Sequence, residues 1–165
     1  MSCLGVHFAL SSEQVETLQS ITTDAERREY LAEYIEEALL GTECAYETDK
    51  AWDAIHRVLT SGRHMPHLDI ASLSLVILGG KSLYEAPDYI MRLVEPSQVR
   101  EIAEALPRVR REDVVKAYSS IHDEDYQVSK SAEDLDYTLE YFEGLLPFFK
   151  HAAESGLYVL FSADQ

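Results

Sequence analysis

The chain has 165 residues, of which 46% are hydrophobic and 10% aromatic, and these values are typical of one folded domain rather than of a disordered segment. Its 30 acidic and 14 basic side chains give a formal net charge of −16, which would repel a nucleic-acid backbone or an anionic membrane. The excess of acidic side chains indicates a solvated acidic surface, and such a surface also suits a basic protein partner.

Cysteine usage and the first residues of the chain bear on its compartment. Cys3 and Cys44 form neither a CxxC pair nor a dense disulfide framework. The N-terminus lacks a basic region followed by an apolar one, and no window reaches the ~18 apolar residues of a membrane span. We therefore expect a cytoplasmic protein.

The first forty residues are expected to form one strand and two helices. Residues 3–10 alternate in a way that predicts a half-buried strand. Capping-box spacing predicts a short helix after Ser11 and a longer helix that begins after Thr23 and runs to about Gly41. An acidic connection should follow, in which we expect no regular element.

The next helix is predicted from Lys50 to Thr60, with either Thr48 or Asp49 as its capping residue. Residues 73–78 are a short apolar run stopped by two glycines, and we expect a buried irregular or helical segment there. Residues 89–94 alternate with β-favouring side chains, which predicts a strand.

The C-terminal part is expected to be mainly helical. A proline in the first turn and apolar side chains at helical spacing predict a helix over 96–106, and a second one is expected over 111–118. A long helix should start at Ser131, and Pro147 should kink or break it in the turn just before. Residues 157–162 are predicted to form the last strand.

These elements indicate a single α+β domain over residues 1–165. The strands are few, the helices are many, and the strict strand–helix alternation of a parallel sheet is absent. We expect a small mixed or antiparallel sheet that includes the N-terminal and C-terminal strands.

The segment 49–60 holds the chain's only tryptophan, one helical turn before a histidine. Trp52 belongs to an apolar helical face and His56 lies at the edge of that face, so core packing with a boundary histidine is the simplest interpretation. The alternative is a small pocket in which Trp52 forms a wall, His56 titrates, and Asp49 or Asp53 orients the imidazole.

A metal site in the following loop is a weaker candidate. His64 and His67 are three residues apart and Asp69 follows, but Pro66 argues against a regular helix between the histidines. No second His or Cys pair completes four ligands, so no metal is favoured and no cofactor is expected.

Two further clusters have simple structural interpretations. Residues 79–82 end in the letters of a phosphate-binding loop, but Leu75 stands where that motif needs its first glycine, so we expect a turn. The basic cluster of Arg108, Arg110 and Arg111 would complement the dipole of the helix ending at Leu106, or bind the acidic residues 123–125.

Several segments together resemble the YfbM-like family, a bacterial group labelled as a domain of unknown function. The resemblance extends over nearly the whole chain. Its most specific part is the Lys-Ala-Trp-Asp-x-x-His string at residues 50–56, and the other parts are Leu10-Ser11-Ser12-Glu13, Ile77-Leu78-Gly79-Gly80, Val94-Glu95-Pro96-Ser97-Gln98-Val99 and Phe148-Phe149. Where the family tends to have Ile-Tyr-Pro, this chain has Asp125-Tyr126-Gln127-Val128. The resemblance implies one α+β domain in a bacterial cytoplasm, and it implies no activity.

The sequence thus favours a non-catalytic binding or interaction domain with an acidic surface and a small pocket at Trp52 and His56. One alternative is a hydrolase-like or metal-assisted enzyme that uses His56 or the pair His64 and His67. Another is an immunity or regulatory factor that binds a basic protein. The sequence predicts neither the oligomeric state nor a particular ligand.

Overall fold

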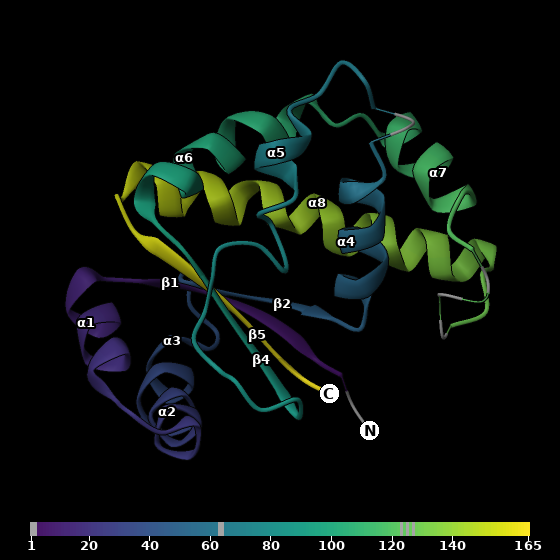
Figure 1. Ribbon diagram of the computed structural model, residues 1–165. Helices are drawn as coiled ribbons and strands as arrows, with labels where there is room; N and C mark the ends of the chain where they lie inside the picture. Colours follow the sequence, from purple (N-terminus) through teal and green to yellow (C-terminus); the bar gives the residue numbers. More distant parts are fainter. Residues whose placement is uncertain (1–2, 63–64, 123, 125, 127) are drawn as a thin grey trace.

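The computed structural model of the protein describes residues 3–62, 65–122, 124, 126 and 128–165. Within these ranges the chain forms one antiparallel sheet of five strands in the order β2-β1-β5-β4-β3 (Figure 1). The strands are β1 (Gly5–Leu10), β2 (Ala45–Asp49), β3 (Lys81–Ser82), β4 (Tyr89–Val94) and β5 (Tyr158–Asp164). The sheet includes the N-terminal and C-terminal strands, as predicted, and these two strands pair with each other.

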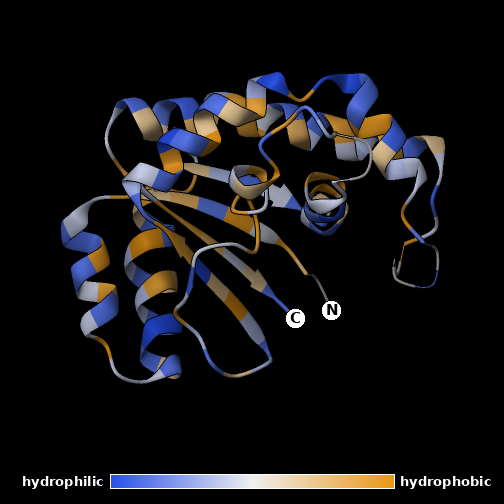
Figure 2. Ribbon diagram, turned by 45° about the horizontal axis from the view of Figure 1, so that its top comes forward, coloured by the Kyte–Doolittle hydropathy of each residue, from blue (hydrophilic) through white to orange (hydrophobic). Residues whose placement is uncertain are grey.

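Helices cover both faces of the sheet (Figure 1). One face carries α1 (Ser12–Ser20), α2 (Asp24–Tyr30), the π-helical turn η1 (Leu31–Glu36) and α3 (Glu37–Leu39). The other carries α4 (Ala51–Thr60), α5 (Ile70–Leu73), α6 (Pro96–Ala105), the 3-10 turn η2 (Leu106–Arg108), α7 (Arg111–Ser119) and α8 (Ala132–Glu154). Two buried clusters result, one on each face, and Figure 2 shows the strands between them as largely apolar. No helix in the described ranges combines the length and the apolar character that crossing a membrane would require.

The prediction that residues 3–10 form a half-buried strand was wrong about the burial. Phe8 and Leu10 pack into the cluster beneath α1, while His7 and Ala9 point to the opposite face and are equally buried. One set of alternating positions carries mostly larger side chains and the other set mostly smaller ones. The alternation therefore does not mark an apolar face and a polar face of the strand. Because β1 lies between β2 and β5 and helices cover both faces, all its residues except the half-buried Val6 are buried.

Strand β2 replaces the predicted acidic connection, and it changes the start of the following helix. Thr48 caps nothing, because it is buried and its hydroxyl donates to the Gly5 carbonyl at 3.1 Å. Asp49 has a positive φ of 48° and ends the strand, so α4 begins after Lys50 without a side-chain cap. Acidic residues are uncommon in strands, which hid this edge strand in the sequence.

The expected break at Pro147 does not occur, since α8 runs without interruption from Ala132 to Glu154. Pro147 and Glu143, whose carbonyl loses its hydrogen-bond donor, are both exposed. Water can therefore satisfy that carbonyl, and the buried Leu145, Phe148 and Phe149 hold the helix on both sides of the proline.

The paired glycines lie in an irregular segment before β3, with a bend at Gly80. Gly80 has a φ of 75°, and a Cβ atom at this position would collide with the Leu93 carbonyl. Only glycine combines this backbone conformation with so close an approach.

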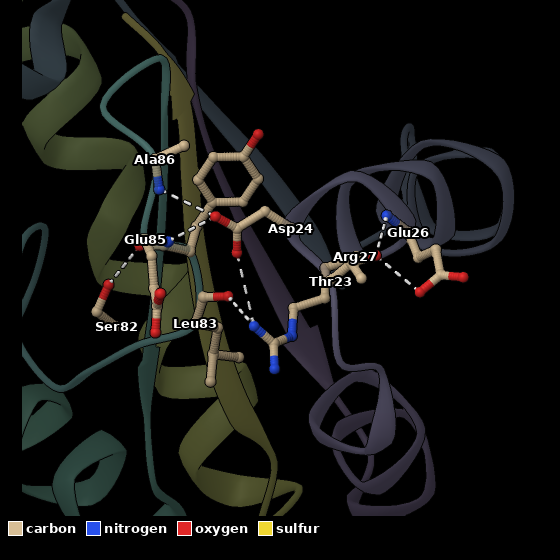
Figure 3. Close-up of polar contacts among 9 residues, drawn as sticks. Thr23, Asp24, Glu26, Arg27, Ser82, Leu83, Glu85 and Ala86 are labelled. Atoms are coloured by element: carbon tan, nitrogen blue, oxygen red, sulfur yellow. Dashed lines mark hydrogen bonds and ion pairs between the residues drawn. The ribbon is translucent and has the colours of Figure 1, made fainter.

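One acidic side chain fastens α2 to the loop that follows β3 (Figure 3). The Asp24 carboxylate accepts hydrogen bonds from the amides of Glu85 and Ala86, both at 2.9 Å. Arg27 lies 3.7 Å from the same carboxylate and donates to the Leu83 carbonyl at 3.0 Å. The first turn of α2 therefore holds the loop through charge-assisted bonds.

Replacing Asp24 with alanine is expected to lower the free energy of unfolding by about 1–3 kcal/mol, because two amides lose their acceptor. Asp24→Asn keeps an acceptor oxygen and should cost less. Urea denaturation gives the stability, and hydrogen exchange of the Glu85 and Ala86 amides locates the change. Glu29→Ala, at an exposed position of the same helix, is the matched control and should stay within ~0.5 kcal/mol of wild type. A loss for Asp24→Ala no larger than for this control would contradict the assignment.

Candidate functional site

Trp52 is part of the core beneath α4. Its side chain is only 7% exposed, and its indole nitrogen donates to the Cys3 carbonyl at 2.8 Å. The ring packs at a tilt against Phe161, 5.6 Å between centroids, and a Cβ atom at Gly5 would lie 2.7 Å from it. Trp52 therefore joins α4 to the start of β1, and it offers little surface to a ligand.

His56 lies at the edge of the same helix face and is half-buried. Burial lowers the pKa of its imidazole, and the nearby charge of Asp53 opposes this effect. Asp53 accepts a hydrogen bond from Arg57 at 3.0 Å, and no residue in the described ranges is hydrogen-bonded to the imidazole. The carboxylate–histidine pair of the enzyme hypothesis is thus not assembled.

Asp49 is directed toward α8 instead of toward His56. It lies beside Tyr137, whose hydroxyl also accepts from the Lys50 amide at 3.3 Å. Burial, followed by the effect of Asp49, raises the pKa of Tyr137 to about 12. Of the four predicted site residues, the structure therefore separates Asp49 from the other three.

The residues that were considered as metal ligands make other contacts. His67 lies 3.8 Å from the Asp113 carboxylate, and Asp69 caps α5 by accepting from the hydroxyl of Ser72 at 2.7 Å and from its amide at 3.3 Å. The hydrogen bond from the Ser72 hydroxyl is the main reason why the pKa of Asp69 is lowered. His64 lies outside the described residues, and the described part of the chain contains no group of three or more potential metal ligands.

In the arginine cluster, Arg108 lies in the last turn of η2, which continues α6, whereas Arg110 and Arg111 make contacts elsewhere. Arg110 caps α7, donating to the buried carboxylate of Asp113 from its amide and its guanidinium at 2.9–3.1 Å. These hydrogen bonds hold the pKa of Asp113 below its usual value. Arg111 reaches across to Glu143 on α8 at 3.3 Å. Asp123 and Asp125, which were expected as partners of the cluster, lie outside the described residues.

A different cluster lies where β2 contacts α8. Tyr137 and Tyr141 pack edge to face with their centroids 4.8 Å apart, and both are partly exposed. Burial raises the pKa of Tyr141, and the charges of Asp49, Glu140 and Glu47 raise it further, so all three carboxylates are near enough to act on this side chain. We call these five residues the tyrosine–acid patch.

The close approach of β2 and α8 builds this patch. The Tyr46 hydroxyl donates to the Tyr141 carbonyl at 2.8 Å, and any Cβ atom at Gly144 would collide with that hydroxyl. Sequence reasoning missed the patch because Glu47 and Asp49 stand on a strand that was not predicted. The one available signal was the spacing of Tyr137 and Tyr141 on a helix.

These features define the class of protein: a single α+β domain whose five-stranded antiparallel sheet is covered on both faces by helices. The chain belongs to the family described as "Domain of unknown function (DUF1877)", which matches residues 1–162. This membership agrees with the YfbM-like resemblance carried by the tryptophan segment.

One solved structure with the same fold is that of YfbM from Escherichia coli, described as a protein of unknown function. The TM-score is 0.69 at 19% sequence identity, and the match covers 97% of this chain and 99% of that chain. An identity this low shows the common fold alone. No curated protein matches the chain.

Proposed function

We propose that the protein is a non-catalytic binding domain that docks a basic segment of a partner protein on the tyrosine–acid patch. The observation that carries this proposal is the edge-to-face pair of Tyr137 and Tyr141, together with the charges of Asp49, Glu140 and Glu47 that act on Tyr141. Family membership and the likeness to an Escherichia coli protein support a bacterial origin, and the two free cysteines support a cytoplasmic location.

The charges of the patch favour a cationic ligand. Within the described ranges, Glu47, Asp49 and Glu140 form no ion pair with a lysine or an arginine. No basic side chain therefore neutralises these carboxylates, and a cation near Tyr141 would be attracted by them. Tyrosine faces attract cations as well, and tyrosine is enriched among residues that dominate binding energies.

Asp49 is the predicted site residue that belongs to this proposal. Trp52, His56 and Asp53 lie outside the patch, and the burial of Trp52 gives no support to a pocket wall. The enzyme alternative needs a carboxylate or a second histidine hydrogen-bonded to His56, and the described residues supply neither.

Neutralising two patch carboxylates, in the double variant Glu47→Gln/Glu140→Gln, is expected to weaken binding of an alternating arginine–glycine peptide about fivefold. This corresponds to about 1 kcal/mol for two partly exposed charge pairs. Calorimetric titration at low ionic strength measures the effect, and the dependence of Kd on salt should become shallower in the variant.

The matched control removes the same charge elsewhere. Glu16→Gln/Glu33→Gln changes two exposed carboxylates on α1 and η1, on the other side of the sheet. This control should bind the peptide within twofold of wild type, since long-range charge is screened. Equal weakening in both double variants would show that net charge, and not the patch, attracts the peptide.

A further inference from the structure

Three side chains near the start of β2 form a nucleophile–base–carboxylate series. The Cys44 sulfur lies 3.7 Å from Nε2 of His151, within hydrogen-bonding distance for sulfur. Nδ1 of the same ring lies 3.7 Å from the Glu43 carboxylate. The two ring nitrogens thus face different partners, which is the arrangement in which an imidazole accepts a thiol proton while a carboxylate orients it.

The backbone around Cys44 is fixed on both sides. Its carbonyl accepts from the Ala9 amide at 2.8 Å, and its amide donates to the Thr42 hydroxyl at 3.1 Å. That hydroxyl donates in turn to the Leu39 carbonyl at 2.7 Å. The thiol is therefore held toward α8 by bonds from three neighbouring segments.

Electrostatics make the thiol dependent on a base. Burial, followed by the charge of Glu43, raises the pKa of the Cys44 thiol, so the resting group keeps its proton at neutral pH. His151 stands in the last turn of α8, where its Nε2 faces the sulfur and its Nδ1 faces Glu43. A proton that leaves the sulfur therefore has an acceptor within reach.

The hydrogen bonds around Cys44 limit the reactions that its thiol can perform. The Cys44 amide is already bonded to Thr42, so it cannot stabilise the oxyanion of an acyl-transfer reaction. Thiol–disulfide exchange needs no such donor, because the negative charge moves from one sulfur to another.

We propose that Cys44 is a thiol-modification site at which small disulfides form mixed disulfides, with His151 as the general base. His151 takes the thiol proton as the Cys44 sulfur attacks one sulfur of the disulfide. The disulfide bond breaks, a bond to Cys44 forms, and the leaving thiolate receives the proton from the imidazolium. One thiol and one disulfide are consumed, and one mixed disulfide and one thiol result, so the reaction needs no other oxidant. The site is independent of the tyrosine–acid patch.

The test measures the rate at which 2-hydroxyethyl disulfide, a neutral reagent, adds to the folded protein, followed by mass spectrometry. A Cys3→Ser background leaves Cys44 as the only thiol. His151→Ala in this background is expected to slow the reaction at least about tenfold at neutral pH, because a general base is lost. Added free imidazole should restore part of the rate to this variant.

Two results would overturn the proposal. A folded His151→Ala variant that reacts at the rate of its Cys3→Ser parent would show that the imidazole is not the base. A folded parent whose Cys44 acquires no adduct would show that the thiol is closed to small disulfides. Alanine is a good helix former, so the variant should fold, and His151→Gln provides a second one with the same expected loss. Far-UV circular dichroism confirms that each protein is folded.

Discussion

Lowering the pH from 6.5 to 4 is expected to remove about 3 kcal/mol from the free energy of unfolding through one side chain, His7. His7 is completely buried, and desolvation lowers the pKa of its imidazole from 6.5 to about 4, although the hydrogen bond with Val76 opposes this effect. Nε2 lies 2.8 Å from the Val76 carbonyl, whereas Nδ1 has no hydrogen-bond partner among the described residues.

The sign of the change in stability with pH depends on which state, folded or unfolded, binds the proton. Above pH 6.5 the imidazole is neutral in the folded and the unfolded protein, so it contributes no pH dependence. Between pH 6.5 and 4 only the unfolded state takes up the proton, and stability falls by about 1.4 kcal/mol per pH unit. Protonated Nδ1 would have to donate into a cage of Phe148, Phe149 and Phe161, which offers no good acceptor.

Urea denaturation at several pH values tests this prediction, with His7→Gln as the comparison. Glutamine keeps a donor for the Val76 carbonyl and does not titrate in this range. The difference between the two proteins isolates His7, because His56, whose pKa is also lowered by burial, is present in both. Identical slopes between pH 6.5 and 4 would mean that His7 does not hold its neutral form in the fold.

Local signals explain which elements could be predicted from the sequence. Ser11 and Gln14 form the expected capping box, and Thr23 and Ser131 accept from the amides of Glu26 and Asp134. Each of these contacts spans three residues, so the sequence contains all of its determinants. The starts of α1, α2 and α8 were therefore predictable.

Elements defined by distant contacts were not predictable in the same way. Strand β2 exists because Ala45 to Asp49 pair with β1, about forty residues away, and its acidic side chains obscure its strand character. Continuity of α8 through Pro147 depends on which side of the helix faces solvent, and this is a property of the packed molecule.

The candidate sites also differ in whether their residues are adjacent or far apart in the sequence. The tryptophan segment was found because its residues are adjacent in the sequence, but the tyrosine–acid patch joins β2 to α8, and so does the contact of Cys44 with His151. In both cases the partners are about one hundred residues apart in the chain. Apart from the helical spacing of Tyr137 and Tyr141, neither cluster has a motif by which sequence reasoning could detect it.

Trp52→Ala is expected to lower the free energy of unfolding by about 3–5 kcal/mol, the usual cost of removing a large buried aromatic side chain. The substitution empties the space between α4 and Phe161, and it removes the donor to the Cys3 carbonyl that holds the start of β1. Trp52→Phe keeps an aromatic ring and should cost less, about 1–2 kcal/mol, mainly through the lost hydrogen bond and the smaller ring. Urea denaturation of the three proteins gives both values.

The same variants decide between packing and binding at this tryptophan. If Trp52 serves the core, folded Trp52→Phe binds the arginine–glycine peptide as tightly as wild type, because the patch residues on β2 and α8 are unchanged. A Trp52→Ala protein that lost less than ~0.5 kcal/mol of stability, yet bound the peptide more weakly, would instead make the indole part of a binding surface. The 7% exposure of the ring and its hydrogen bond to Cys3 favour the first result, since a residue that closes the core has little area to offer a ligand.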